Sequence, residues 1–271
     1  MRDALSFPIA VSERISFIYL DKVVLERDGH SLVARESSTR TVIPIGKTAV
    51  LFLGPGSTVS HAAVALCALE GALLTWVGEG GVRLYATGTG RSLPDNVLKQ
   101  ARLRLDPAAR LAAARKLYFH MFGEPAPERR SIEQLRGLEG SKVKAIFQNL
   151  ASKYQLTWSG RTHDLRNPLN LGISTATAAI YGLAEAVILS LGYSPSIGFV
   201  HSGDERSFVF DLADTEKFKT VVPIAFETVS ASAIDVEKRV RLKCRDLFYQ
   251  QKLAEKFVSI LENVFRADGD N

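Results

Sequence analysis

The stretch GTGRSLPDNVLKQARLRLDPAARLAAARKLYFHMFG, residues 88–123, contains the point at which the spacing of apolar residues changes. Before it, apolar residues come in short runs separated by turn signals, which is typical of β-strands. After residue 95 they recur at helical spacing, with Pro107 at a break. The sequence therefore predicts an α+β protein: a β-sandwich-like domain at 1–87, a linker at 88–96 and an all-α catalytic domain at 97–271.

Local signals in the first part of the chain fit this division. Strand patterns occupy residues 15–29, 31–46, 48–56 and 72–88. The pair Asp28-Gly29 is a hairpin turn signal between the first two of them. Residues 57–71 predict one short helix, with Ser57 or Ser60 as its N-cap.

The second part is a series of helical blocks, at residues 96–123, 131–154, 176–192, 215–229 and 240–265. Ser131 and Gln134 have the spacing of a capping box at the start of the second block. Residues 171–200 carry a single charged side chain, Glu185, and are therefore apolar enough to be tested as a membrane span. Glycines, a proline and hydroxyl residues interrupt the stretch, so we expect a buried core helix followed by a loop.

The composition excludes several classes of protein. Hydrophobic residues make up 46% and charged residues 23% of the chain, as in an ordinary globular protein and unlike a disordered or fibrous one. Cys67 and Cys244 stand far apart, without the spacing of a disulfide framework or a zinc site. The first residues lack the apolar core of a secretion signal. We expect a cytoplasmic protein.

Positive charge is concentrated in one segment. The net charge of the whole chain is +5. Counted from the sequence, residues 1–90 are neutral, residues 91–162 carry +8 and residues 163–271 carry −3. Such a segment is suited to binding a polyanion such as DNA, although a solvated helix face has the same composition.

Candidate chemistry begins with two aspartates. Phosphate-loop, HExxH, EF-hand and GxSxG motifs are absent from the sequence. Asp211 and Asp214 follow the apolar run FVF at a spacing of three, which puts both carboxylates on one face if a helix spans them. The alternative is that Asp214 is the N-cap of a helix that starts at Thr215.

A histidine and a glutamate complete the set. His201 ends an apolar run before Ser-Gly, where a hydrogen-bonded turn residue is the alternative to a ligand. Glu139 stands between Gly137 and Gly140 in a helical block, which indicates either close approach of another group to the backbone or a kink or helix contact. Carboxylates with one imidazole suit Mg²⁺ or Mn²⁺ better than zinc. Beside a basic surface, such a metal points to phosphodiester chemistry.

Three fragments of the chain resemble one known family. They are VSHAAVALCALEGALLTWVGEGGVRLYATG (59–88), FGEPAPERRSIEQLRGLEGSKVKAIF (122–147) and GYSPSIGFVHSGDERSFVFDLADTEKFKTVVPIAFE (192–227). In this order they are similar to the CRISPR adaptation integrase-endonuclease, the first of the CRISPR-associated proteins, in its type I-E form. The resemblance covers about residues 12 to 262 and implies an N-terminal β-sandwich before an α-helical catalytic domain.

The resemblance also implies roles for individual residues. The metal ligands are Glu139, His201 and Asp214, and Asp211 supports the catalytic site. The residues implied to contact DNA are Arg83, Tyr181, Lys217, Arg241 and Arg245. Thr58 stands where close relatives can carry a basic residue, and His163 where a tyrosine is often seen, so the resemblance leaves the DNA contacts of these two positions open.

The implied reaction is insertion of a foreign DNA fragment into a CRISPR array, by attack of its 3′-hydroxyl on a repeat phosphodiester. The implied partners are double-stranded DNA, a second copy of the chain and a small second CRISPR adaptation protein with a ferredoxin-like fold, and no membrane. Two other classes stay open from the residues themselves. One is a metal-dependent nuclease of branched DNA that acts in repair without integration. The other is a non-enzymatic DNA-binding module in which Glu139, His201 and Asp214 are structural.

Overall fold

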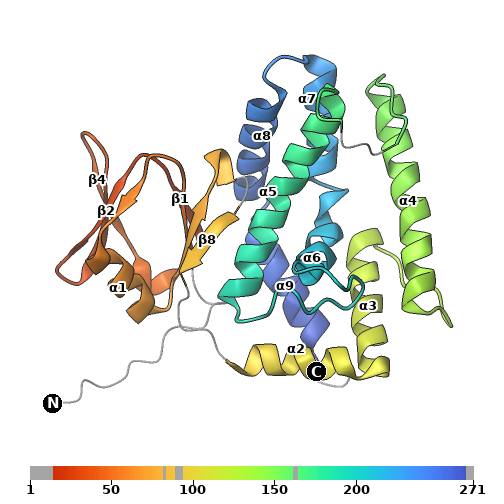
Figure 1. Cartoon of the computed structure of the whole chain (residues 1–271), viewed down its shortest axis with the longest axis horizontal. Coiled ribbons are helices and arrows are strands. Elements are labelled where there is room, and N and C mark those ends of the chain that lie inside the picture. Colours follow the sequence, from red (N-terminus) through yellow and green to blue (C-terminus); the bar gives the residue numbers. More distant parts are fainter. Residues whose placement is uncertain (1–14, 82–83, 89–93, 161–163, 267–271) are drawn as a thin grey trace.

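Strands precede helices along the chain (Figure 1), which confirms the α+β prediction. The structure is a computed structural model that describes residues 15–81, 84–88, 94–160 and 164–266. The strands are β1 (Ile15–Leu20), β2 (Val24–Asp28), β3 (Ser31–Arg35), β4 (Arg40–Ile43), β5 (Thr48–Leu53), β6 (Thr58–Val59), β7 (Leu73–Val77) and β8 (Leu84–Gly88). The helices are α1 (His61–Glu70), α2 (Pro94–Leu105), α3 (Pro107–Phe122), α4 (Ile132–Lys153), α5 (Pro168–Ser190), α6 (Ser207–Lys217), α7 (Val221–Ala231), α8 (Val236–Gln250) and α9 (Leu253–Phe265), with short 3-10 turns η2 (Ile45–Lys47) and η3 (Glu79–Gly81).

The strands form two four-stranded sheets that share a core. One sheet has the order β1-β5-β7-β8, and the other has the order β4-β3-β2-β6. Strands β1, β5 and β7 are parallel, whereas β2 and β3 form the antiparallel hairpin predicted at Asp28-Gly29, with Gly29 at φ +61°. Side chains from both sheets and from α1 make up one buried cluster, which gives the sandwich-like arrangement.

Strand β5 joins the two halves of the protein. All six of its residues are buried, because successive side chains point to opposite faces of the sheet and both faces are covered. Leu51 and Leu53 pack in the core between the sheets, while Val50 and Phe52 pack in the larger core with the helices. The sheet is therefore a platform for the helical part, with β8 beside α5 (Figure 1).

Several helices begin at the capping and break residues that the sequence predicts. The side chain of Ser60 accepts from the backbone N–H of Ala63 and caps α1. Ser131 and Gln134 make both hydrogen bonds of the capping box that starts α4. The break at Pro107 separates α2 from α3, and the side chain of Asp106 caps the second of these helices.

Two helical blocks are divided differently from the prediction. The block at 240–265 is two helices, because Lys252 adopts a left-handed backbone conformation at φ 48° between α8 and α9. The block at 215–229 is also divided: residues 215–217 belong to α6, and α7 starts at Val221. Helix α2 begins at Pro94, so it starts inside the segment predicted to be a linker. The division of the chain into two domains at residues 88–96 stays a prediction.

Helix α5 is the centre of the helical part. It contacts α6, α7, α8 and α9 as well as the first sheet. By length and composition it could cross a membrane, yet 72% of its apolar window is buried inside the protein. The fold thus uses α5 as the core helix that its sequence predicts.

Truncating the centre of α5 should lower stability sharply. Ile180 is completely buried, so we expect Ile180→Ala to reduce the free energy of unfolding by about 2–5 kcal/mol through lost burial and a cavity. Leu105, at the end of α2, is 82% exposed, and Leu105→Ala should change it by less than about 0.5 kcal/mol. Unfolding in denaturant measures the change in the free energy of unfolding for each variant. Equal changes for the two variants would contradict a core centred on α5.

Candidate metal centre

Both candidate aspartates lie inside helix α6. The helix runs from Ser207 to Lys217, so the alternative in which Asp214 is an N-cap is wrong. A spacing of three residues places Asp211 and Asp214 on adjacent turns. Asp211 is 1% and Asp214 5% exposed, because α6 packs among other helices on most of its surface.

Asp211 holds the loop that precedes its own helix. Its carboxylate accepts from the backbone N–H groups of Phe199, Val200 and His201, at 2.6, 3.0 and 2.9 Å. The same carboxylate lies 2.8 Å from Nδ1 of the His201 ring. Because an ionised carboxylate can only accept, Nδ1 carries the proton and the Nε2 lone pair is left available to a ligand. Asp211 therefore sets the position and the tautomer of His201.

Gly198 makes this loop geometry possible. A Cβ atom there would lie 2.5 Å from the carbonyl oxygen of His201 and 2.9 Å from the backbone of Ser207. Both neighbours are backbone atoms that cannot rotate away. Only glycine fits, which gives the GFVH sequence a steric explanation.

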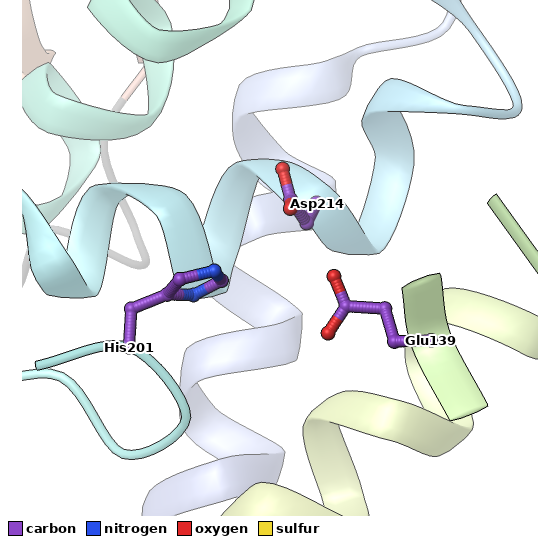
Figure 2. Close-up of side chains that lie close together, drawn as sticks. All are labelled: Glu139, His201 and Asp214. Atoms are coloured by element: carbon purple, nitrogen blue, oxygen red, sulfur yellow. The ribbon is translucent and has the colours of Figure 1, made fainter. Parts of the chain in front are cut away.

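Three side chains from separate elements meet at the centre of the site (Figure 2). Glu139 comes from α4, His201 from the loop between α5 and α6, and Asp214 from α6. One ligand atom from each lies within 4.8 Å of the others. The structure thus brings together the three segments whose meeting the sequence could not establish.

The electrostatics of the cluster are those of an anionic pocket. Burial raises the pKa of Glu139 to about 7, and the negative charge of Asp214 adds to this, while His201 and Lys217 oppose it. Burial alone would lower the pKa of His201, but the hydrogen bond and charge of Asp211, with the charges of Asp214 and Glu139, raise it. Two carboxylates and an imidazole nitrogen in this arrangement fit Mg²⁺ or Mn²⁺, which prefer oxygen ligands.

A buried lysine lies next to the cluster. The ammonium of Lys217 forms an ion pair with Asp214, donates to the hydroxyl of Tyr181 at 3.2 Å, and is 3% exposed. Burial disfavours its charge, but Asp214 and Tyr181 outweigh that effect and raise the pKa of Lys217. Lys217 and Tyr181 therefore lie beside the triad; whether either contacts DNA stays a prediction.

Two further residues implied to contact DNA lie on another helix. Arg241 and Arg245 belong to α8, which packs on α5 and η3. Arg241 bonds Glu79 at 3.0 Å and Glu237 at 2.8 Å, and Arg245 bonds Asp246 at 2.7 Å. Of the remaining positions, Thr58 lies in β6, and Arg83 and His163 lie outside the described residues.

The glycines beside Glu139 lie in open space. Apart from the adjacent residues and the backbone of α4 itself, a Cβ added at Gly137 or Gly140 would meet no atom of the described residues within 4 Å. Helix α4 also runs without interruption through both positions. Close packing against another described element therefore does not explain them, and both glycines are exposed at the surface of the helix.

Two residues that contact the histidine loop were missed by the sequence reasoning. Gln100 is completely buried on α2, and Arg110 lies on α3; both bond backbone carbonyls of residues 194–199. Gln100 falls three residues after Val97 and three before Leu103, which places it on the apolar face of the helix. This spacing was the one signal in the sequence that its polar side chain is buried.

Comparison with known proteins identifies the family. The family model described as "CRISPR associated protein Cas1" matches residues 120–262. The chain is 46% identical over 267 residues to the CRISPR-associated endonuclease Cas1 of Escherichia coli (strain K12), covering 96% of this chain and 88% of that protein. It is 45% identical over 269 residues to the protein of the same name from Geobacter sulfurreducens, covering 97% and 88%. The crystal structure of a TtCas1–DNA complex superimposes with a TM-score of 0.83 at 38% identity, covering 93% of this chain and 96% of that one. This chain belongs to the Cas1 family of CRISPR-associated endonucleases.

Proposed function

We propose that this protein inserts fragments of foreign DNA into a CRISPR array, by attack of a fragment's 3′-hydroxyl on a phosphodiester of the repeat. The observation that carries the proposal is the convergence of Glu139, His201 and Asp214, with ligand atoms within 4.8 Å of one another. Membership of an endonuclease family and the basic segment at 91–162 support it. One similar structure is that of a TtCas1–DNA complex, which supports DNA as the substrate; we propose that this DNA is double-stranded.

Each residue of the site has a separate role in the proposed reaction. Glu139 and Asp214 would hold a divalent cation, Mg²⁺ or Mn²⁺, through carboxylate oxygens, and His201 through Nε2. The cation supplies Lewis-acid stabilisation of the negative charge that develops on the phosphoryl oxygens. Asp211 keeps the proton on Nδ1 of His201 and so keeps Nε2 as the ligand atom. Lys217 neutralises part of the negative charge of Asp214 within the buried part of the site.

DNA reaches the site along α4. Gly140, which follows Glu139 directly, and Gly137 on the opposite side of the helix are both exposed, with no other element close to them. Basic residues of the same segment lie before and after them on this helix and its N-terminal loop, at Arg129, Arg130, Arg136, Lys142 and Lys144. We propose that a phosphodiester enters beside Glu139, where these charges attract it.

The partners are those of a two-protein integration complex. We propose that a homodimer of this chain works with a small second CRISPR adaptation protein of ferredoxin-like fold, in the cytoplasm. The partner positions the DNA ends, while the reacting groups come from this chain. The proposed DNA contacts are Tyr181 and Lys217, which lie beside the triad, Arg241 and Arg245 on α8, and Arg83, which is outside the described residues.

Removal of Glu139 should abolish DNA joining. A short duplex with free 3′-hydroxyls is incubated with a supercoiled plasmid carrying a repeat, Mn²⁺ or Mg²⁺, and the small partner. We expect joined product from the wild type and at least a hundredfold less from Glu139→Ala, because one of three cation ligands is lost. Glu133→Ala, an exposed carboxylate on the same helix, should join DNA like the wild type.

Other outcomes of this assay separate the competing functions. Nicking of branched DNA without joining, even with the partner present, would favour a repair nuclease. Equal products from wild type and Glu139→Ala would mean that the triad is not the active centre. Loss of folding in Glu139→Ala, seen by circular dichroism, would favour a structural role for the cluster.

Cation binding should strengthen as the pH rises through neutrality. The pKa of Glu139 is raised to about 7 and that of His201 is raised, so both groups hold protons below this range that a cation has to displace. We expect the affinity for Mn²⁺ to fall as the pH is lowered through about 7, by up to about tenfold per pH unit for each proton that the cation displaces. Calorimetric titration at several pH values measures this, and a constant affinity from pH 5.5 to 8 would contradict it.

A further inference from the structure

The loop that carries His201 is held from two sides. On one side, α6 binds it through Asp211, which accepts the N–H groups of residues 199–201. On the other side lie the consecutive helices α2 and α3, which begin about 100 residues earlier in the chain. These helices supply two polar side chains to the same loop.

Gln100 fixes the first half of the loop. It is completely buried, and its amide oxygen accepts from the backbone N–H of Ser194 at 2.8 Å. Its amide nitrogen donates to the carbonyls of Ser194 and Ile197, at 3.0 and 2.8 Å. These three bonds use both ends of the amide, so no hydrophobic residue of similar volume can replace its contacts.

Arg110 fixes the second half. Its Nε donates to the carbonyl oxygen of Phe199 at 2.9 Å. The N–H of that same residue donates to Asp211 at 2.6 Å. Phe199, two residues before His201, is therefore bonded from α3 through its carbonyl and from α6 through its amide.

We propose that Gln100 and Arg110 are positioning residues for His201, which hold its loop so that the ring nitrogen meets Glu139 and Asp214 at the distances a divalent cation requires. Metal–ligand bonds tolerate errors of only about 0.2 Å, and groups that orient a ligand typically change affinity by 10–100-fold. The proposal rests on the cation site of the proposed function, but not on the integration step.

The experiment measures Mn²⁺ binding to the full-length protein by calorimetric titration, with DNA absent. We expect Arg110→Ala to weaken Mn²⁺ binding about tenfold, and Arg110→Lys, which keeps a donor for the Phe199 carbonyl, to recover most of that loss. Gln100→Ala should weaken binding at least as much. Lys116→Ala is the matched control: Lys116 is also on α3 and also donates to a backbone carbonyl, that of Arg266 at 2.8 Å, but away from the loop.

Hydrogen exchange separates positioning from general stability. In metal-free Arg110→Ala, the amides of residues 199–201 should exchange faster than in the wild type, while those of α5 keep their protection. Arg110 is only partly buried, so we expect Arg110→Ala to fold. The proposal can therefore be tested with this variant even if Gln100→Ala does not fold. A high concentration of Mn²⁺ should restore DNA joining to Arg110→Ala, because that variant keeps all three candidate ligands. It should not restore joining to Glu139→Ala, which lacks one of them.

Three results would overturn the proposal. The first is unchanged Mn²⁺ affinity and loop exchange in Arg110→Ala. The second is weaker DNA binding in EDTA with normal Mn²⁺ affinity, which would make Arg110 a DNA contact. The third is a wild type whose Mn²⁺ binding does not depend on Glu139. Tight, Glu139-dependent Mn²⁺ binding without DNA joining would instead contradict only the integration function.

Discussion

The carboxylate of Asp211 accepts four hydrogen bonds from a single loop, and the geometry of the site depends on them. Three of the donors are successive backbone N–H groups and the fourth is the ring of His201. A buried carboxylate without such donors would be strongly destabilising, so the loop has to close on it when α6 packs. The fold therefore couples the burial of α6 to the placement of a candidate ligand. Gly198 is the steric condition for that closure.

The charges of the site are balanced incompletely within the protein. Glu139, Asp211 and Asp214 contribute negative charge, and Lys217 is paired with only one of them. Burial is the main cause of the raised pKa of Glu139, and the negative charge of Asp214 adds to it. Bringing two carboxylates this close is unfavourable in isolation, because like charges repel more strongly where water is excluded. A divalent cation would remove the repulsion, which connects the electrostatics of the unliganded protein to the function proposed for it.

The elements that build the site come from the whole helical part of the chain. The candidate ligands lie on α4, on the loop after α5 and on α6, while the side chains that hydrogen-bond the loop from its other side lie on α2 and α3. Helix α5 connects them to the first sheet, since it packs on α6 and on the sheet as well. A site assembled in this way is rigid where the helices pack and open beside α4, where the glycines leave the backbone uncovered.

The sequence by itself determined the features that depend on neighbours along the chain. It predicted the change from strands to helices, the caps at Ser60 and Ser131, and a buried core helix within residues 171–200, because periodicity and capping are local. It also named Glu139, His201 and Asp214, through motifs that resemble a family. It did not predict the left-handed residue that divides α8 from α9. Nor did it predict that Gln100 and Arg110 bond a loop about 90 residues later, since only the tertiary packing of α2 and α3 brings those groups within hydrogen-bonding distance.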